Sequence, residues 1–213
     1  MMGRTHALSG TVVGLGTGLV LDMTVESMIL CTLLSTGAAM IPDLDHPKSS
    51  ISLSGGILTR GISSLVEKFS GGHRKATHSL LGVLVAGVLS WVCTRVHLEG
   101  LWIFLMVMGL LSVLPIRKGL PLAGMGLALT FLGVVSSLPT EIAPWCLVLG
   151  MATHILGDTI TVGGCPLLFP NRRLVSLGWF RTNHPIERVL QTMMLVSLVP
   201  MGMIGLGAFP GVW

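Results

Sequence analysis

A soluble surface cannot be built from this chain of 213 residues, because only 10% of them are charged and soluble domains carry about 25%. The mean hydropathy of +0.83 and the long apolar runs instead indicate an integral membrane protein. The net charge of +4 is not a nucleic-acid signal, since the basic residues lie between apolar runs and form no basic stripe.

The apolar runs predict an all-α, polytopic membrane helical bundle of about seven transmembrane helices, forming a single domain over residues 1–213. In chain order, the expected helices lie near His6–Leu21, Ser27–Ile41, Thr77–Thr94, Leu101–Leu114, Leu120–Leu138, Ala143–Thr159 and Val189–Phe209. We expect the first helix to be retained, because it is rich in glycine and no signal-peptide cleavage site follows it. It carries Gly10, Gly14 and Gly18 at four-residue spacing, which predicts close packing against another helix.

Three connecting segments predict other structures. Between the second and third helices, the run ISLSGGILTRGISSLVEKF places its apolar residues near helical spacing, which is typical of an amphipathic helix on the membrane surface. Arg117 and Lys118 mark a tight turn between the fourth and fifth helices. Residues 163–188 are rich in Gly, Pro, Asn and Arg, and predict a structured loop.

The basic residues predict the orientation of the bundle. With seven crossings, twelve of the 13 Lys and Arg residues fall on the side where the chain begins, and only Arg95 falls on the other side. Cytoplasmic loops of membrane proteins carry such an excess. We therefore expect a multi-pass protein of a bacterial-type inner membrane, with its N-terminal side in the cytoplasm.

Residues typical of metal sites gather on that same cytoplasmic side. They stand at the ends of the expected helices or in the adjoining loops: His6, Asp43, Asp45, His46, His73, His78, His154, Asp158, His184 and Glu187. His154 and Asp158 are four residues apart, so their side chains share one helix face. We expect His73 in a loop and His78 in the first turn of the third helix. Histidine nitrogens with carboxylate oxygens suit zinc, manganese or iron, and so many ligands suggest two ions.

Each of these residues also has a simpler explanation when it is taken alone. Asp43 or Asp45 could form a turn, and His6 could be a packing residue. Thr77 is expected to be the N-cap of the third helix. His97 falls on the opposite side and is not expected to contribute. The gathering of the whole set on one side is what favours a metal site.

Three segments together resemble the signature of a known family: IPDLDHPKS, GHRKATHSLL and ATHILGDTITVGGCPLLFP. They look like the YdjM-type family, whose members are described as membrane-bound metal-dependent hydrolases. His6, Glu187 and Arg188 stand where that family has a His and a Glu-Arg pair. The resemblance covers most of the chain, although the fourth and fifth helices carry no motif and His184 matches none. The helical H-x-x-x-D pattern is more distantly similar to zinc-dependent phospholipase C enzymes.

The lead hypothesis is a membrane-bound metal-dependent hydrolase that cleaves a phosphoester of a lipid or lipid-linked substrate at the cytoplasmic membrane face. The expected cofactor is one or two zinc ions, with manganese or iron as alternatives, and the ion would activate water. The predicted metal ligands are His6, Asp43, His73, His78, His154 and Asp158. The predicted catalytic carboxylates, one of them the general base, are Asp45 and Glu187. The predicted phosphate-binding residues, or else positive-inside anchors, are Arg74 and Arg188.

Two other functions compete with this hypothesis. The first is a metal-ion transporter or sensor, but transporters bind near the bilayer midplane on broken helices, whereas these ligands cluster at helix ends. The second is a membrane protein with a structural metal site, which a closed ligand shell would favour. A serine hydrolase is disfavoured because the sequence has no G-x-S-x-G elbow. The expected partners are membrane lipids and a phosphorylated substrate.

Overall fold

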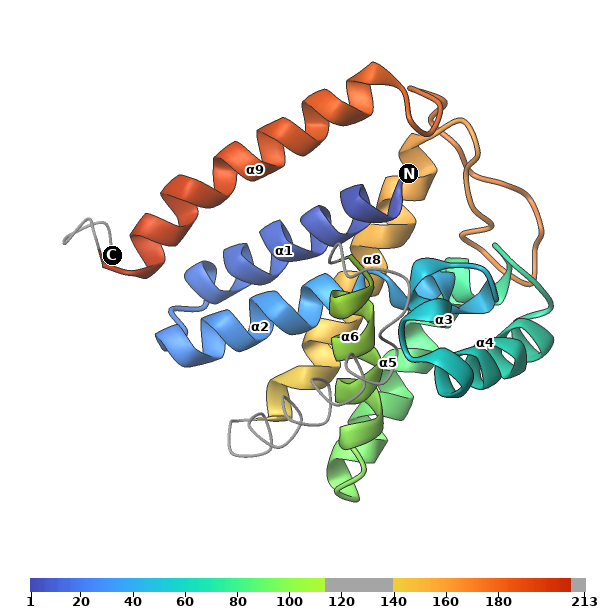
Figure 1. The fold of residues 1–213 in the computed structure, drawn as a ribbon, viewed down its shortest axis with the longest axis horizontal. Helices are drawn as coiled ribbons and strands as arrows, with labels where there is room; N and C mark the ends of the chain where they lie inside the picture. The colour runs from blue at the N-terminus through green and yellow to red at the C-terminus, as the bar shows by residue number, and fades with distance from the viewer. Residues whose placement is uncertain (114–139, 208–213) are drawn as a thin grey trace.

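The computed structural model describes residues 1–113 and 140–207, and within these ranges every regular element is a helix. The α-helices are α1 (Gly3–Val20), α2 (Val25–Ala38), α3 (Ser50–Ser54), α4 (Gly56–Ser70), α5 (Leu80–Arg95), α6 (Gly100–Val113), α8 (Ala143–Ile160) and α9 (Pro185–Gly205) (Figure 1). Short 3-10 helices are η1 (Ile41–Asp45), η2 (Ala76–His78) and η3 (Thr140–Ile142). The all-α prediction is confirmed. The expected fifth helix and the Arg117–Lys118 turn lie outside the described residues.

The glycine ridge of α1 packs against α2, as its spacing predicts. Gly10, Gly14 and Gly18 are all buried. A Cβ atom on Gly10 would lie 2.5 Å from the carbonyl oxygen of Ser35, and one on Gly18 would lie 2.5 Å from the side chain of Met28. The two helix backbones can approach this closely only because these positions lack side chains.

Helix α2 is the centre of the bundle, because small residues also let α6 and α8 approach it. Gly37 of α2 backs onto Gly109 of α6, and neither position has room for a Cβ atom. On another side, Gly150 of α8 lies against Ala38. Helix α9 packs on α1, and α5 packs on α8. The C-terminal end of α2, which leads into η1, is therefore enclosed by the bundle.

The structure does not support the predicted number of membrane spans. Within the described ranges, the stretches long and apolar enough to cross a membrane are Val25–Asp45 and Pro185–Gly205. Helices α5 and α6 are apolar, but they have 16 and 14 residues. At about 1.5 Å per residue they are about 24 and 21 Å long, which is less than the hydrocarbon thickness of about 30 Å. The apolar runs predicted where helices form, but not which of them are long enough to span.

Helix α4 confirms the predicted helix between the second and third apolar runs. Compared with a surface helix of a soluble protein, its polarity is inverted. Its buried face carries hydroxyl groups, and Thr59 Oγ1 donates to the carbonyl of Ser52 at 2.9 Å. Large apolar side chains are exposed on it, with Ile57 91% exposed and Phe69 84% exposed, beside the exposed basic residues Arg60 and Lys68. A helix that buries hydroxyls and exposes large apolar side chains has the pattern of a helix lying against lipid.

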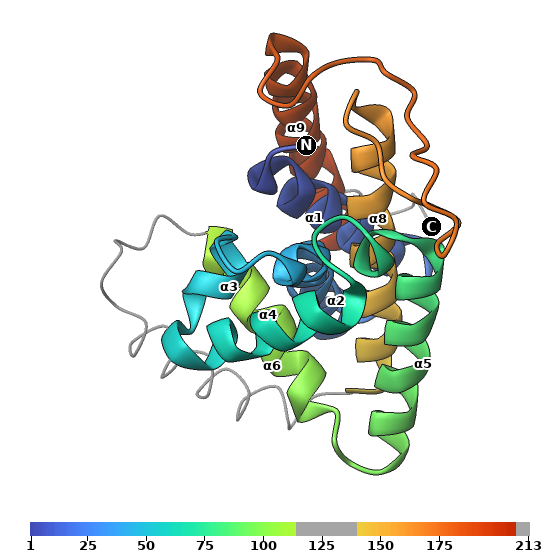
Figure 2. The same ribbon diagram turned by 90° about the vertical axis from the view of Figure 1, so that its right-hand side faces the viewer.

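The segment between α8 and α9 is an irregular but ordered loop, as predicted. Cys165 and Val175 exchange two backbone hydrogen bonds, of 3.2 and 2.9 Å. Thr161 and Phe180 form a second isolated bridge. Figure 2 shows this loop leaving the end of α8, passing beside α5 and returning to the start of α9.

Candidate metal centre

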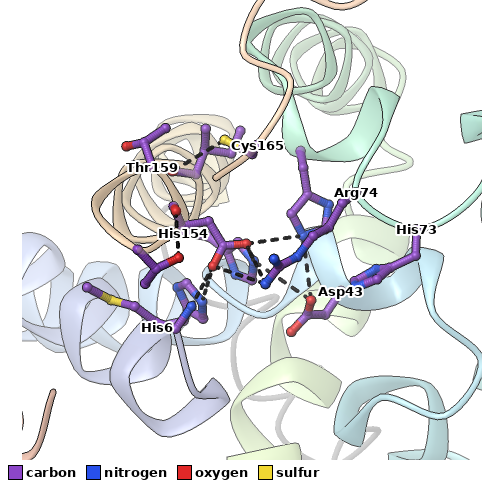
Figure 3. Close-up of polar contacts among 12 residues, drawn as sticks. His6, Asp43, His73, Arg74, His154, Thr159 and Cys165 are labelled. Carbon is purple, nitrogen blue, oxygen red and sulfur yellow. Dashed lines mark hydrogen bonds and ion pairs between the residues drawn. The ribbon is translucent and has the colours of Figure 1, made fainter. Parts of the chain in front are cut away.

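Four segments that are far apart in the sequence bring the predicted ligands together (Figure 3). They are α1 with His6, η1 with Asp43 and Asp45, η2 with His78, and α8 with His154 and Asp158. Pro42 stands in the first turn of η1, where its fixed φ favours a tight turn directly after α2. That turn places Asp43 beside His154 of α8 and Asp45 beside residues 73–78.

Four of these residues, Asp43, His78, His154 and Asp158, form what we call the ligand cluster. His78 Nε2 and His154 Nε2 lie 3.6 and 3.8 Å from Asp43 Oδ1. The same two nitrogens lie 3.9 and 3.8 Å from Asp158 Oδ2. A tetrahedral ion with bonds of about 2.0–2.2 Å separates its ligand atoms by about 3.3–3.6 Å. The four measured separations are thus only slightly longer than those around a bound ion. The ligand atoms of Asp43, His78 and His154 all lie within 4.8 Å of one another, and so do those of His6, His154 and Asp158.

Three atoms of the ligand cluster are buried without a hydrogen-bond partner among the described residues: His78 Nε2, His154 Nε2 and Asp158 Oδ2. Leaving such groups unsatisfied costs about 1–3 kcal/mol each, so folded proteins seldom keep several side by side. The fourth residue, Asp43, is 25% exposed and gives the cluster its contact with the surface. Two imidazole nitrogens without hydrogen-bond partners, together with two nearby carboxylates, fit a divalent transition metal.

Backbone geometry prepares His154 to bind through Nε2. Its Nδ1 lies 2.6 Å from the carbonyl oxygen of Ala39, which can only accept a hydrogen bond. Nδ1 must therefore carry the proton, and in the neutral ring Nε2 keeps its lone pair. Histidine ligands in metal sites are commonly oriented by such a bond from the second nitrogen.

Asp45 is the centre of a second group of contacts, which we call the Asp45 network. The side chain is fully buried, and its Oδ1 accepts from His73 Nδ1 at 2.7 Å. Its Oδ2 accepts from the backbone N–H of Arg74 at 3.0 Å and from the hydroxyl of Thr77. His78 Nδ1 lies 3.2 Å from the same oxygen. Asp45 thus holds one nitrogen of His78 so that the other faces the ligand cluster.

The two carboxylates beside His78 also shift its protonation. Burial acts to lower the pKa of His78, but its contacts with Asp43 and Asp45 outweigh burial and raise the pKa to about 9. A site that attracts a proton so strongly attracts other cations for the same reason. An ion bound at Nε2 must displace that proton.

Nitrogen atoms of three residues surround the carboxylate of Asp158. His6 Nε2 lies 3.3 Å from its Oδ1, and the His6 ring stacks on His154 with centroids 3.7 Å apart. Arg74 Nη2 forms an ion pair with its Oδ2 at 3.3 Å, and the amino group of Met1 lies 2.6 Å from its Oδ1. Asp158 therefore offers one oxygen to the ligand cluster and the other to the His6 side, where a second ion would find two further ligand atoms.

Comparison with known proteins bears on this arrangement. A family model described as YdjM inner membrane protein matches residues 1–116, which is more than half of the chain. The chain belongs to the YdjM inner membrane protein family. Searches of curated proteins and of solved structures return no significant match. The matched segment contains Asp43, Asp45 and His78, whereas His154 and Asp158 lie beyond it and join these residues only in the fold.

Glu187 lies in a different set of contacts of this YdjM-family chain. Its buried carboxylate accepts from the backbone N–H groups of Met2 and Asn183, both at 2.6 Å, and from the hydroxyl of Thr5 at 2.7 Å. These contacts tie the start of α9 to the start of α1. The predicted catalytic role of Glu187 stays a prediction, and its contacts are those of a residue that joins two helices.

The structure places the other predicted residues apart from the ligand cluster. His73 belongs to the Asp45 network, where the ligand atoms of Asp45, His73 and His78 all lie within 4.8 Å of one another, so its predicted role as a metal ligand stays a prediction. The His46 ring packs 4.9 Å from His73. His184 caps α9, where its Nδ1 accepts from the backbone N–H of Ile186 at 3.3 Å. Arg188 is exposed on α9, one residue after the buried Glu187. Of the two predicted phosphate-binding arginines, only Arg74 lies beside the cluster.

Two residues of the site have roles that the sequence did not predict. Thr77 is not the N-cap of the third predicted helix, because Ser79 caps α5 by accepting from the N–H of Gly82 at 3.1 Å. Thr77 donates to Asp45 instead. The carbonyl of Ala39 orients His154, and a backbone group carries no signal in the sequence. In the sequence, the only sign of this role of Thr77 is that its hydroxyl group stands one residue before the candidate ligand His78.

Proposed function

We propose that this protein is a membrane-bound metal-dependent hydrolase that cleaves a phosphoester of a lipid or lipid-linked substrate. The observation that carries the proposal is the ligand cluster, in which His78 Nε2 and His154 Nε2 are buried without a hydrogen-bond partner among the described residues. Both nitrogens lie 3.6 to 3.9 Å from Asp43 Oδ1 and from Asp158 Oδ2, and the latter oxygen also forms an ion pair with Arg74. A divalent ion, zinc or else manganese or iron, would be held by donors of this kind, and Asp43, His78 and His154 form one candidate set of three ligands beside Asp158. When bound, such an ion supplies a polarised phosphoryl oxygen and a water of lowered pKa.

The residues of the chain have separate roles in this proposal. Asp43, His78, His154 and Asp158 hold the ion, and His6 with the second oxygen of Asp158 provides a place for another. Asp45 positions His78, because its contacts occupy both carboxylate oxygens.

The guanidinium of Arg74 binds the substrate phosphate, since it lies beside Asp158 and is 33% exposed. The exposed edge of Asp43 provides the side from which the substrate enters.

Membership of an inner membrane protein family supports a substrate drawn from lipid. The exposed apolar side chains of α4 support the same conclusion, because this helix packs against η1, the segment that carries Asp43 and Asp45. We assign the site to the cytoplasmic side, on the grounds that Lys48, Arg60, Lys68, Arg74 and Lys75 are concentrated around it in the sequence.

The proposal is tested with purified full-length protein reconstituted in liposomes. Metal content, chelator-sensitive phosphate release from lipid phosphoesters, and metal flux across the membrane are measured on the same sample. Hydrolysis without flux, lost in Asp43→Asn and retained in His97→Ala, is the expected result. Flux that disappears in His154→Ala, with no hydrolysis, would establish a transporter. A tightly bound ion with neither activity would establish a structural metal site.

A further inference from the structure

A groove of about 440 Å³ lies between α4, α5 and α6, and its lining is almost wholly apolar. Leu65 and Phe69 of α4 form one wall, and Val85 and Leu89 of α5 form another. The hydroxyl groups of its lining belong to Ser70 and Thr77. Both already donate hydrogen bonds, Ser70 to the carbonyl of Glu67 at 3.3 Å and Thr77 to Asp45. A polar ligand would gain little here, whereas a hydrocarbon would bury its surface.

The inner end of this groove is formed by the same two turns that carry ligands. Ile41 and Leu44 of η1 line it on either side of Asp43 in the sequence. Ala76 and Thr77 of η2 line it directly before His78. Apolar grooves also lie between α5 and α8 and on the outer face of α9. Neither is lined by residues of η1 or η2.

The outer end of the groove opens between exposed apolar side chains. Phe69, Leu65 and Leu89 project there and are all exposed. A hydrocarbon chain in the groove would thus run from the ligand cluster at one end to an apolar surface at the other. The lining of the groove thus includes residues of both turns that carry candidate ligands and exposed apolar residues of α4 and α5.

We propose that this groove binds one hydrocarbon chain of the lipid phosphoester whose phosphate lies at the ligand cluster. The proposal rests on the proposed function, and it adds that recognition uses the chain as well as the phosphate. The enzyme would then act on a phosphoester while the tail stays in an apolar environment. Phosphoesters without such a tail would bind through the phosphate alone.

The test uses a hexadecyl phosphate that carries a photoreactive diazirine at mid-chain. The zinc-loaded full-length protein is labelled in phosphatidylcholine nanodiscs, and the labelled peptides are identified by mass spectrometry. Val85→Trp fills the groove. Its matched control is Val88→Trp on the same helix, because Val85 and Val88 are 47% and 51% exposed and Val88 lines the groove between α5 and α8 instead.

We expect labelling to concentrate on α4 and α5, to be competed by hexadecyl phosphate and not by hexadecanol, and to fall about tenfold in Val85→Trp but not in Val88→Trp. Two results would overturn the inference: equal labelling of the outer face of α9, or an equal fall in labelling in the two tryptophan variants. Either would mean that the probe reaches the protein from the bulk lipid and does not bind in the groove. Metal content and inorganic phosphate binding are measured on the same samples. If the protein binds neither metal nor phosphate, the proposed function is overturned. If it binds both but the label is spread evenly, only the inference about the groove is overturned.

Discussion

Asp45 and Asp158 are buried carboxylates of the same site, and their surroundings differ in one respect. Both oxygens of Asp45 accept hydrogen bonds, from His73, from the backbone of Arg74 and from Thr77. Asp158 Oδ2 is buried without a hydrogen bond and faces two histidine nitrogens that also lack partners. Burial alone therefore does not distinguish a carboxylate that binds an ion from one that positions other residues.

His78 connects the two groups because each of its nitrogens belongs to one of them. Nδ1 lies 3.2 Å from Asp45, and Nε2 lies 3.6 Å from Asp43. The Asp45 network is complete without an ion, whereas the ligand cluster is not. From this difference we infer that the network sets the orientation of His78 before an ion arrives, and that the ion stabilises the cluster.

The largest expected effect comes from removing a residue of the ligand cluster. His154→Ala or Asp158→Ala should weaken metal binding by more than about a hundredfold, which exceeds the usual effect of partners outside the first coordination sphere. Metal content of the purified variants, measured by mass spectrometry, checks this expectation. His97→Ala is the control, because His97 lies at the far end of α5. Unchanged metal content in both cluster variants would remove this pair from the ligands.

Disturbing the Asp45 network should have an intermediate effect. Asp45→Asn keeps the shape of the side chain but directs amide hydrogens toward groups that now donate to a carboxylate, so metal affinity should fall about 10–100-fold. Competition with a chelator measures this change. Glu187→Gln is the control and should leave the affinity within about twofold, since its contacts join α1 and α9.

The same pair of variants tests the two predicted catalytic carboxylates. If Asp45 is the general base, Asp45→Asn will abolish hydrolysis while metal affinity stays unchanged. That result would contradict a positioning role. Loss of hydrolysis in Glu187→Gln, with metal content and folding intact, would establish a catalytic role for Glu187 in the same way.

Much of this site could be predicted from the sequence because the ligands stand at the ends of apolar runs. The spacing of His154 and Asp158 placed both on one helix face, and in the structure His154 Nε2 lies 3.8 Å from Asp158 Oδ2 and 3.8 Å from Asp43 Oδ1. The difference between Asp43 and Asp45 could not be predicted. It depends on the backbone of Arg74, whose φ of 56° turns its N–H toward Asp45, and such a conformation leaves no sign in an arginine.

In the fold, too, one feature could be predicted from the sequence and another could not. Glycine spacing predicted the contact between α1 and α2 because it reports directly on the approach of two backbones. The number of membrane spans could not be predicted from hydropathy. An apolar run of 14 residues, such as α6, is equally suited to a core helix, and α6 packs on α2 in the bundle.

The link through His78 predicts how metal binding depends on pH. Because the pKa of His78 is raised to about 9, the ion-free protein holds a proton there below that pH. An ion must displace it, so affinity should rise about tenfold per pH unit up to about pH 9 and then level off. Chelator competition between about pH 6 and pH 10 measures the slope. In Asp45→Asn, the pH at which the metal affinity levels off should be lower. A metal affinity that does not change with pH above 7 would contradict the competition between the ion and the proton of His78.

The smallest expected effect concerns Arg74, which takes part in both groups. Its backbone N–H donates to Asp45, and its guanidinium lies 3.3 Å from Asp158. Asn tolerates a positive φ and keeps the N–H, so Arg74→Asn removes the guanidinium and leaves the Asp45 network in place. The guanidinium is 33% exposed and partly screened, so phosphate binding to the metal-loaded protein should weaken only about fivefold.

Isothermal titration with inorganic phosphate measures this change, and Arg188→Gln is the matched control. Arg188 stands on the exposed face of α9, so its replacement should leave phosphate affinity unchanged. Metal affinity should not fall in Arg74→Asn, because a positive neighbour is removed from the cluster while every ligand atom stays in place. If Arg74 is only a positive-inside anchor, both variants will bind phosphate as the wild type does. A loss of metal in Arg74→Asn would instead mean that the backbone contact with Asp45 had been disturbed, and the two groups would then be one network.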